Sequence, residues 1–172
     1  MALLESLNLP LGAPAADFLL EGVDGRRYTL NDFADAKVTV IVFMCNHCPY
    51  VQEMWGKLVN LQADFKDRSV EFVGINPNTA NPEYEEETME KMKEYALNYE
   101  MNFPYLEDPD QAVAKKYKAQ CTPDIYLFDE AKKLAYHGRI DELGEAIEAV
   151  IAGKAQNTEQ KLSCGCSIKW VE

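Results

Sequence analysis

The feature that most limits how this chain can fold is an apolar, strand-like run that passes directly into a helical pattern. Residues 37–44 are rich in β-branched side chains, as expected for a strand buried on both faces. The apolar spacing then changes to one face of a helix, carried by Val51, Met54, Trp55, Leu58, Leu61 and Phe65. Because strands that alternate with helices form parallel sheets, this junction predicts an α/β fold.

The rest of the chain extends this unit to a central mixed sheet flanked by helices. An N-terminal hairpin with a turn at Asp24-Gly25 is predicted within residues 12–30. Further strands are predicted at 70–75, 124–129 and 133–139. Further helices are predicted from Asn81-Pro82, from Asp108-Pro109 to Tyr117, and over 142–151.

The C-terminal residues 153–172 are predicted to be a tail that docks on the body of the protein. Ile168 and Trp170 are too apolar to be left in water, and we expect the indole to be buried. The whole chain, 1–172, is therefore expected to be one domain.

Composition excludes several classes of protein. The chain has 172 residues, 47% of them hydrophobic and 27% charged, which is typical of one folded domain. A net charge of -12 argues against nucleic-acid binding, which needs clustered Lys and Arg. The N-terminus carries Glu5 and has no positively charged segment, and no apolar run approaches the ~20 residues that span a bilayer. We therefore expect a cytoplasmic protein with no membrane partner.

Five cysteines in a reducing compartment indicate catalysis or metal binding rather than structural disulfides. Cys45 and Cys48 lie where the strand passes into the helix, and the positive end of a helix dipole favours a thiolate. Their spacing corresponds to a Cα separation of ~5–6 Å, which suits a disulfide. We expect Cys45, exposed where the helix begins, to attack and Cys48 to resolve the mixed disulfide.

The neighbouring residues bear on this chemistry. A cationic His47 would stabilise the thiolate, or it is a surface residue without a role. Pro49 either follows an N-cap at Cys45 or begins the helix with Cys48 as its cap. Thr122-Pro123 is placed at the start of a strand, where a proline without an N–H is tolerated.

Four segments carry a resemblance to a known family: FMCNHCPYV, NFPYLEDPDQAVAKKYKAQCTPDIYLFD, YHGRID and GCSIKW. They resemble the thioredoxin-like, peroxiredoxin-like branch of the alkyl hydroperoxide reductase/thiol-specific antioxidant (AhpC/TSA) family, over nearly the whole chain. The resemblance implies a thioredoxin-like fold in which Pro123 is cis and packs beside Cys45 and Cys48. We then expect the Thr122 backbone to face outward, where an extended substrate can pair with it as an added strand.

The favoured function is thiol-disulfide exchange by the Cys45-x-x-Cys48 pair, without a cofactor. Its substrate would be a protein or small-molecule disulfide, and its reducing partner a molecule such as thioredoxin or glutathione. The alternative is an antioxidant thiol peroxidase, with Cys48 or Cys45 attacking peroxide. Peroxiredoxins have a Thr-x-x-Cys-Pro motif that Cys48-Pro49 matches only in part, because Cys45 replaces the threonine.

A third interpretation, from another class, is a Zn or Cu(I)-binding thiol protein. Its ligands would be Cys45, Cys48, Cys164 and Cys166, with His47 as a substitute. This spacing is not that of a standard zinc finger, which makes the metal site the weakest of the three interpretations.

The other cysteines leave alternatives open. Cys121 either approaches the active pair or is a buried, inert thiol. Cys166 belongs to the GCSIKW segment, whereas Cys164 is an addition to the family pattern. The two tail thiols are docked and reduced, or form a strained disulfide, or one of them exchanges with Cys45 or Cys48.

Overall fold

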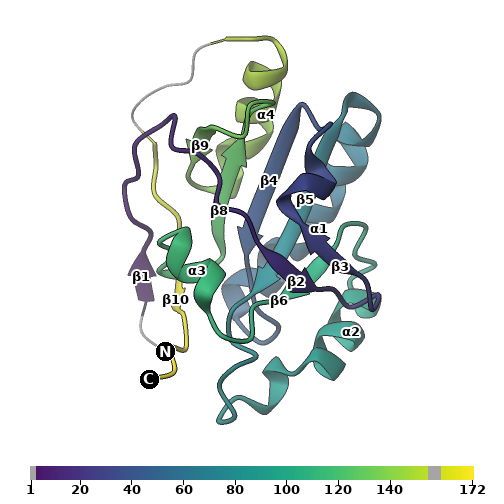
Figure 1. Ribbon diagram of the computed structural model, residues 1–172, viewed down its shortest axis with the longest axis vertical. Coiled ribbons are helices and arrows are strands. Elements are labelled where there is room, and N and C mark those ends of the chain that lie inside the picture. The colour runs from purple at the N-terminus through teal and green to yellow at the C-terminus, as the bar shows by residue number, and fades with distance from the viewer. Residues whose placement is uncertain (1–2, 155–159) are drawn as a thin grey trace.

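A five-stranded mixed sheet forms the centre of the computed structural model, which describes residues 3–154 and 160–172 (Figure 1). Its strands lie in the order β6 (Tyr105–Glu107), β5 (Val70–Asn76), β4 (Val38–Phe43), β8 (Asp124–Phe128) and β9 (Leu134–His137). β4, β5 and β6 run parallel, whereas β8 and β9 add antiparallel strands. This arrangement confirms the predicted α/β class and the mixed sheet.

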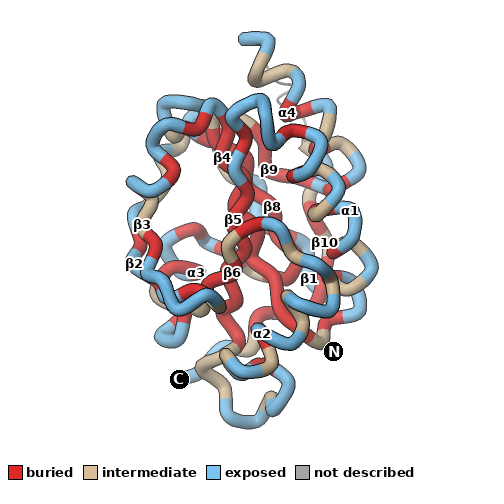
Figure 2. Tube along the Cα trace, turned by 90° about the vertical axis from the view of Figure 1, so that its right-hand side faces the viewer, coloured by how far each residue is buried: buried red, intermediate tan, exposed pale blue. Residues whose placement is uncertain are grey.

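The central strand β4 is buried on both faces, as its β-branched sequence predicts (Figure 2). Val38, Val40 and Val42 point into one hydrophobic cluster, whereas Ile41 and Phe43 point into the other. Side chains alternate along a strand, so this single strand contributes to the core on each side of the sheet. The end of β4, which leads to the two cysteines, is therefore held in place from both sides.

Helices cover both faces of the sheet. The long helices α1 (Pro49–Phe65), α2 (Met89–Asn98) and α4 (Leu143–Ile151) contribute to the first cluster. The short helix α3 (Ala112–Lys116) and the hairpin of β2 (Leu19–Glu21) and β3 (Arg27–Thr29) contribute to the second. Single 3-10 turns are η1 (Leu30–Phe33), η2 (Lys66–Arg68), η3 (Glu85–Glu87) and η4 (Ile140–Glu142).

The predicted start of α2 at Asn81-Pro82 is wrong. Asn81 instead bends the chain, because its side-chain oxygen accepts the N–H of Glu83 at 3.1 Å. The helix begins at Met89, where the Thr88 hydroxyl accepts the N–H of Lys91 at 3.2 Å. The intervening residues lead Glu87 into the protein interior, where it is 1% exposed.

The helix predicted from Asp108-Pro109 begins later, at Ala112. The Asp108 carboxylate still accepts the N–H groups of Val113 at 3.3 Å and Ala114 at 2.8 Å. The predicted helix start at Asp108-Pro109 is therefore wrong: Gln111 is the N-cap residue, and Asp108 binds the first turn from outside the helix.

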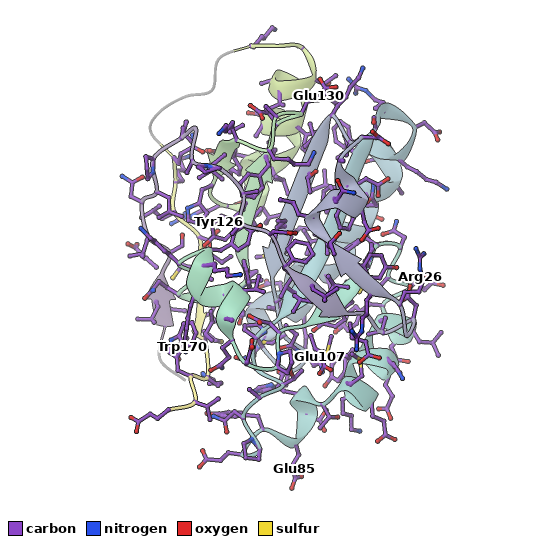
Figure 3. All side chains as sticks on the ribbon, in the orientation of Figure 1. Arg26, Glu85, Glu107, Tyr126, Glu130 and Trp170 are labelled. Carbon is purple, nitrogen blue, oxygen red and sulfur yellow. The ribbon has the colours of Figure 1, made fainter. Side chains whose placement is uncertain are left out.

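The C-terminal tail docks on the body, as predicted, and does so as a strand that the sequence pattern does not predict. β10 (Cys164–Ser167) lies between β1 (Leu3–Glu5) and β7 (Cys121–Thr122) in an antiparallel three-stranded sheet (Figure 1). Ile168 is buried, but Trp170 lies at the margin of the molecule and is 40% exposed (Figure 3). The expected burial of the indole is therefore wrong; the Nζ of Lys115 lies 5.9 Å from the centroid of its ring. Residues 155–159 of the predicted tail fall outside the described residues.

Within 3–154 and 160–172, no helix has both the length and the apolar character needed to cross a bilayer.

Candidate active site

The two cysteines of the C-x-x-C sequence lie between the end of β4 and the first turn of α1. The helix begins at Pro49 and Cys48 is its N-cap residue, which selects the second of the two predicted arrangements. Both cysteines are only 1% exposed. The expectation that Cys45 lies exposed is therefore wrong, because Thr122 and the C-terminal strand lie directly against the pair.

Thr122 contacts both thiols from the opposite side of the site. Its peptide bond to Pro123 is cis, as the family resemblance implies. The Thr122 hydroxyl lies 3.3 Å from Cys45 Sγ, and its carbonyl oxygen lies 3.5 Å from Cys48 Sγ. The segment that faces the cysteine pair is thus the one that the sequence predicts.

Glu87 is a functional candidate that the sequence does not reveal. Its buried carboxylate accepts the backbone N–H of Asn46 at 2.9 and 3.0 Å and that of His47 at 3.1 Å. It also accepts the side-chain amide of Asn76 at 2.8 Å. Charge-assisted bonds of this kind fix the loop that carries both cysteines. In the sequence, Glu87 stands in the acidic run Glu85-Glu86-Glu87, and nothing in that run distinguishes it from its neighbours.

His47 is directed at this carboxylate. Its Nδ1 pairs with Glu87, and its ring stacks on Tyr84 with the centroids 5.7 Å apart. The ligand atoms of Cys45, His47 and Glu87 all lie within 4.8 Å of one another. Stabilisation of a thiolate by His47 stays a prediction, because the contact that the structure shows for the imidazole Nδ1 is with the Glu87 carboxylate.

The environment separates the two thiols in acidity. Burial raises the pKa of Cys45 well above its usual value, and the hydrogen bond that it donates to Cys48 and the nearby Glu87 carboxylate raise it further. The pKa of Cys48 is lowered to about 5, chiefly because Cys45 donates its S–H to it. The thiol of Cys166 and the N–H groups of Val51 and Tyr50, in the first turn of α1, add to this lowering. The two thiols therefore differ in acidity, and Cys48 is the more acidic of the two.

The remaining cysteines occupy different surroundings, and all five are free thiols. Cys166 Sγ lies 2.9 Å from Cys48 Sγ, and burial raises the pKa of Cys166 to about 12. Cys164 is half-buried and lines a groove, and neither tail cysteine is in a disulfide in this structure. Cys121 is fully buried with its Sγ 3.8 Å from the Pro123 carbonyl, and burial raises its pKa, which fits the interpretation of an inert thiol.

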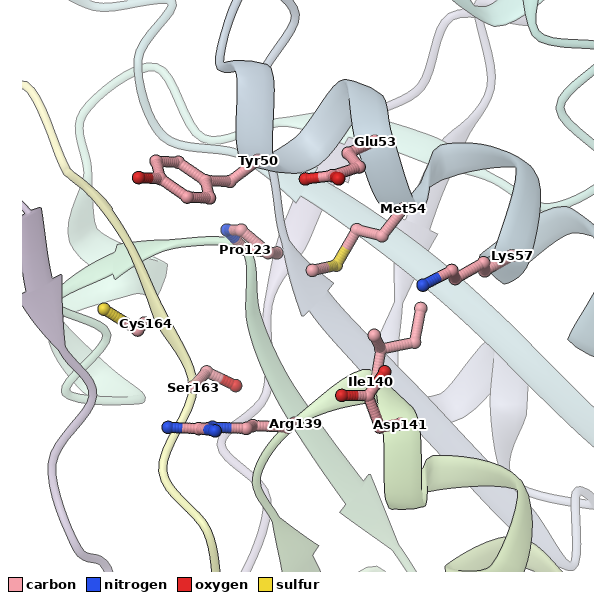
Figure 4. A pocket seen from close by; sticks show the side chains of 10 residues that line it. All are labelled: Tyr50, Glu53, Met54, Lys57, Pro123, Arg139, Ile140, Asp141, Ser163 and Cys164. Carbon is pink, nitrogen blue, oxygen red and sulfur yellow. The ribbon is translucent and has the colours of Figure 1, made fainter.

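A groove of about 230 Å³ opens beside Pro123 (Figure 4). Tyr50 and Met54 of α1 form one side, and Ser163 and Cys164 of the C-terminal tail form the other. Neither Cys45 nor Cys48 is among the residues that line this groove.

The four-thiol metal set is not assembled as predicted. The group of potential ligands that the described part of the chain brings together is Cys45, His47 and Glu87, rather than four cysteines. The oxygens of Glu87 already accept N–H groups from Asn46, His47 and Asn76. This geometry gives the metal-binding interpretation less support than the redox interpretations.

Comparison with known proteins places these features in a family. The model of the AhpC/TSA family matches residues 11–137. The thiol-disulfide oxidoreductase ResA of Bacillus subtilis is 25% identical over 123 residues, which cover 72% of this chain and 64% of that protein. The chain thus spans somewhat less than two thirds of the length of this relative.

Solved structures share the fold. An uncharacterized conserved protein from Geobacillus kaustophilus is 40% identical, with a TM-score of 0.95 over 99% of this chain and 97% of that one. A hypothetical protein from Sinorhizobium meliloti is 36% identical, with a TM-score of 0.93 over 97% and 98% of the two chains. The thioredoxin domain of a thiol-disulfide oxidoreductase from Bacteroides vulgatus is 20% identical, with a TM-score of 0.71 over 83% and 99%. The chain belongs to the AhpC/TSA family and has a thioredoxin-like fold.

Proposed function

We propose that this protein is a thiol-disulfide oxidoreductase in which Cys45 and Cys48 cycle between a dithiol and a disulfide. The observation that carries the proposal is the unequal pair of thiols at the start of α1, facing a cis-proline. Cys48 has a lowered pKa of about 5 and Cys45 has a raised one, so one sulfur is ready to attack while the other retains a proton. The likeness to ResA supports the same reaction class.

The reaction begins at Cys48. Its thiolate attacks one sulfur of a substrate disulfide, the substrate S–S bond breaks, and the other substrate sulfur leaves as a thiolate. A mixed disulfide between Cys48 and the substrate remains. Cys48 therefore takes the attacking role in this proposal, which reverses the order expected from the sequence.

Cys45 completes the reaction. It loses its proton and attacks Cys48 Sγ, which releases the second substrate sulfur as a thiolate and forms the Cys45–Cys48 disulfide. In this proposal the substrate sulfur that leaves takes up the proton that Cys45 gives up. A reducing partner such as thioredoxin or glutathione then returns two electrons and restores the dithiol.

A thiol peroxidase is the second candidate, and one observation favours it. The thiol with the lowered pKa is Cys48, which stands before Pro49 as in the Cys-Pro of the peroxiredoxin motif. Its thiolate would attack the O–O bond, leaving a sulfenic acid on Cys48 and releasing water or an alcohol. Cys45 would then form the disulfide and release a second water. The motif's threonine is replaced by Cys45, which places this candidate second.

The two candidates are separated by a side-by-side assay. Reduction of a protein disulfide and consumption of hydrogen peroxide are measured for the wild type, Cys45→Ala and Cys48→Ala, with the same reductant. We expect the wild type to reduce the protein disulfide faster than it consumes peroxide. Disulfide reduction should be lost in Cys48→Ala and slower than the wild type in Cys45→Ala. Faster peroxide consumption would favour the second candidate, and full activity of Cys48→Ala in both assays would contradict both.

A further inference from the structure

The C-terminal strand occupies the position on Thr122 at which the sequence predicts an extended substrate. Cys166 pairs with Thr122, and Ser167 pairs with Cys121, in the antiparallel ladder between β10 and β7. The backbone beside the cis-proline is therefore not open, because the chain's own tail lies on it.

Gly165 makes this close approach possible. A Cβ atom at position 165 would lie 2.1 Å from the Thr122 carbonyl oxygen, 2.7 Å from its carbon and 3.1 Å from Pro123 Cδ. The first two distances are shorter than non-bonded atoms tolerate, and both atoms belong to backbone that cannot move aside easily. The central glycine of Cys164-Gly165-Cys166 is thus required for the tail to lie against Thr122-Pro123.

The same docking brings a third sulfur to the cysteine pair. Cys166 Sγ lies 2.9 Å from Cys48 Sγ, which is within about 1 Å of the ~2.05 Å length of an S–S bond. The two residues are 2% and 1% exposed, so the contact is enclosed. Cys164 lines the groove instead, so the two tail cysteines can be told apart by experiment.

We propose that Cys166 is a third redox-active thiol, which converts the Cys45–Cys48 disulfide into a Cys48–Cys166 disulfide. Cys166 loses its proton and its sulfur attacks Cys48 Sγ. The Cys45–Cys48 bond breaks, the Cys48–Cys166 bond forms, and Cys45 leaves as a thiolate that takes up a proton. One disulfide is exchanged for another, so no external oxidant or reductant is consumed.

This exchange deepens the proposed function and rests on it, because Cys48 must first be oxidised. Its consequence is a covalent bond that holds β10 over Thr122-Pro123. The oxidised protein then carries its own C-terminal strand in the place of an extended substrate, with Cys45 reduced beneath it.

The test starts from the Cys45→Ser variant, in which Cys166 is the neighbouring thiol left to resolve a mixed disulfide on Cys48. Reduced protein is treated with oxidised glutathione, quenched with an alkylating agent over time, and analysed by intact mass and peptide mapping. We expect a glutathione adduct on Cys48 that disappears as a Cys48–Cys166 disulfide forms. In Cys45→Ser/Cys166→Ser the adduct should persist, whereas in Cys45→Ser/Cys164→Ser it should disappear as in the parent variant.

A second pair of variants tests the docking geometry. Cys45→Ser/Gly165→Ala should retain the adduct, because the added methyl group separates β10 from Thr122. Cys45→Ser/Gly56→Ala is the matched control, since a Cβ atom at position 56 meets nothing within 4 Å. It should lose the adduct as the Cys45→Ser parent does. Circular dichroism checks that both fold. If Gly165→Ala does not fold, the near-isosteric Cys166→Ser comparison decides the question.

The possible failures are distinguishable. An adduct that persists equally with and without Cys166 would overturn this inference and leave the proposed function intact. A Cys48–Cys164 disulfide in place of the Cys48–Cys166 bond would also overturn it. If no variant that retains Cys48 takes up glutathione, both the inference and the proposed function are wrong.

Discussion

At the scale of single residues, the buried carboxylate of Glu87 fixes the loop that carries the cysteine pair and sets the charge beside it. Its negative charge is one cause of the raised pKa of Cys45, after burial and the hydrogen bond to Cys48. We expect Glu87→Gln to lower the Cys45 pKa, because the amide keeps an acceptor but removes the charge. The check is the rate of Cys45 alkylation as a function of pH, measured by peptide mass in a Cys48→Ala background. Glu86→Gln is the control, and identical profiles for the two glutamate variants would contradict the assigned role.

The acidity of Cys48 depends on its neighbours in a definite order. The S–H of Cys45 is the largest cause of the lowered pKa, and the thiol of Cys166 contributes less. Cys45→Ala should therefore raise the Cys48 pKa from about 5 toward the free-thiol value of about 8.5. Cys166→Ala should raise it by a smaller amount. Thiolate absorbance titrated against pH measures both shifts, and a larger effect of Cys166→Ala would reverse the order of the two contributions.

At the scale of secondary-structure elements, the start of α2 decides where Glu87 lies. Thr88 caps the helix through its hydroxyl, whereas Asn81 only stabilises a turn through its bond to Glu83. Thr88→Ala should lower the free energy of unfolding by about 1 kcal/mol, the usual effect of losing an N-cap side chain. Asn81→Ala should lower the free energy of unfolding by less. Chemical denaturation of the reduced protein measures both, and a larger loss for Asn81→Ala would instead support a helix that begins at Asn81.

Elements whose own residues carry the pattern can be predicted from the sequence. The apolar, β-branched residues of β4 and the apolar face of α1 are enough to identify the junction and the Cys45-Cys48 pair. Asp124–Phe128 and Leu134–His137 likewise form the predicted late hairpin. The spacing of apolar residues is enough to predict a strand or helix when burial of one of its faces fixes which of its own residues are apolar.

Elements that depend on distant partners cannot be predicted in this way. The residues of β10, Cys-Gly-Cys-Ser, have little strand propensity, and they form a strand because β1 and β7 pair with them. The buried position of Glu87 depends on N–H groups some 40 residues away in sequence, at Asn46 and His47. Neither the close Cys48–Cys166 contact nor the carboxylate beside Cys45 leaves a local sequence signal.

At the scale of the whole molecule, the unequal thiols couple stability to pH. The pKa of Cys48 is about 5 in the folded protein and about 8.5 in an unfolded chain, so the unfolded chain binds more protons between these values. The stabilisation from Cys48 is therefore fully present above about pH 8.5 and is lost as the pH falls through about 5. The contribution of Cys45 to stability depends on pH in the opposite direction. Because its pKa is raised in the folded protein, this contribution falls as the pH rises above about 8.5.

We therefore expect the stability difference between the reduced wild type and Cys48→Ala to grow with pH from about 5 to about 8.5. Denaturant titrations at several pH values measure it. Cys121→Ala is the matched control, because Cys121 is also a buried thiol but its pKa is raised, so its difference should stay constant over this range. A constant difference for Cys48→Ala as well would show that Cys48 is not held as a thiolate.

The redox couple at Cys48 is tested most directly by an equilibrium titration of the wild-type protein in buffers of reduced and oxidised dithiothreitol. Free thiols are alkylated at each potential, and the disulfides are identified by peptide mass. We expect a two-electron transition, in which the ratio of the two forms changes tenfold for about 30 mV. Across it, Cys48 should pass from a free thiol into a disulfide with Cys45 or with its exchange partner Cys166. Cys48 recovered as a free, alkylated thiol across the whole range would contradict a thiol-disulfide oxidoreductase centred on this residue.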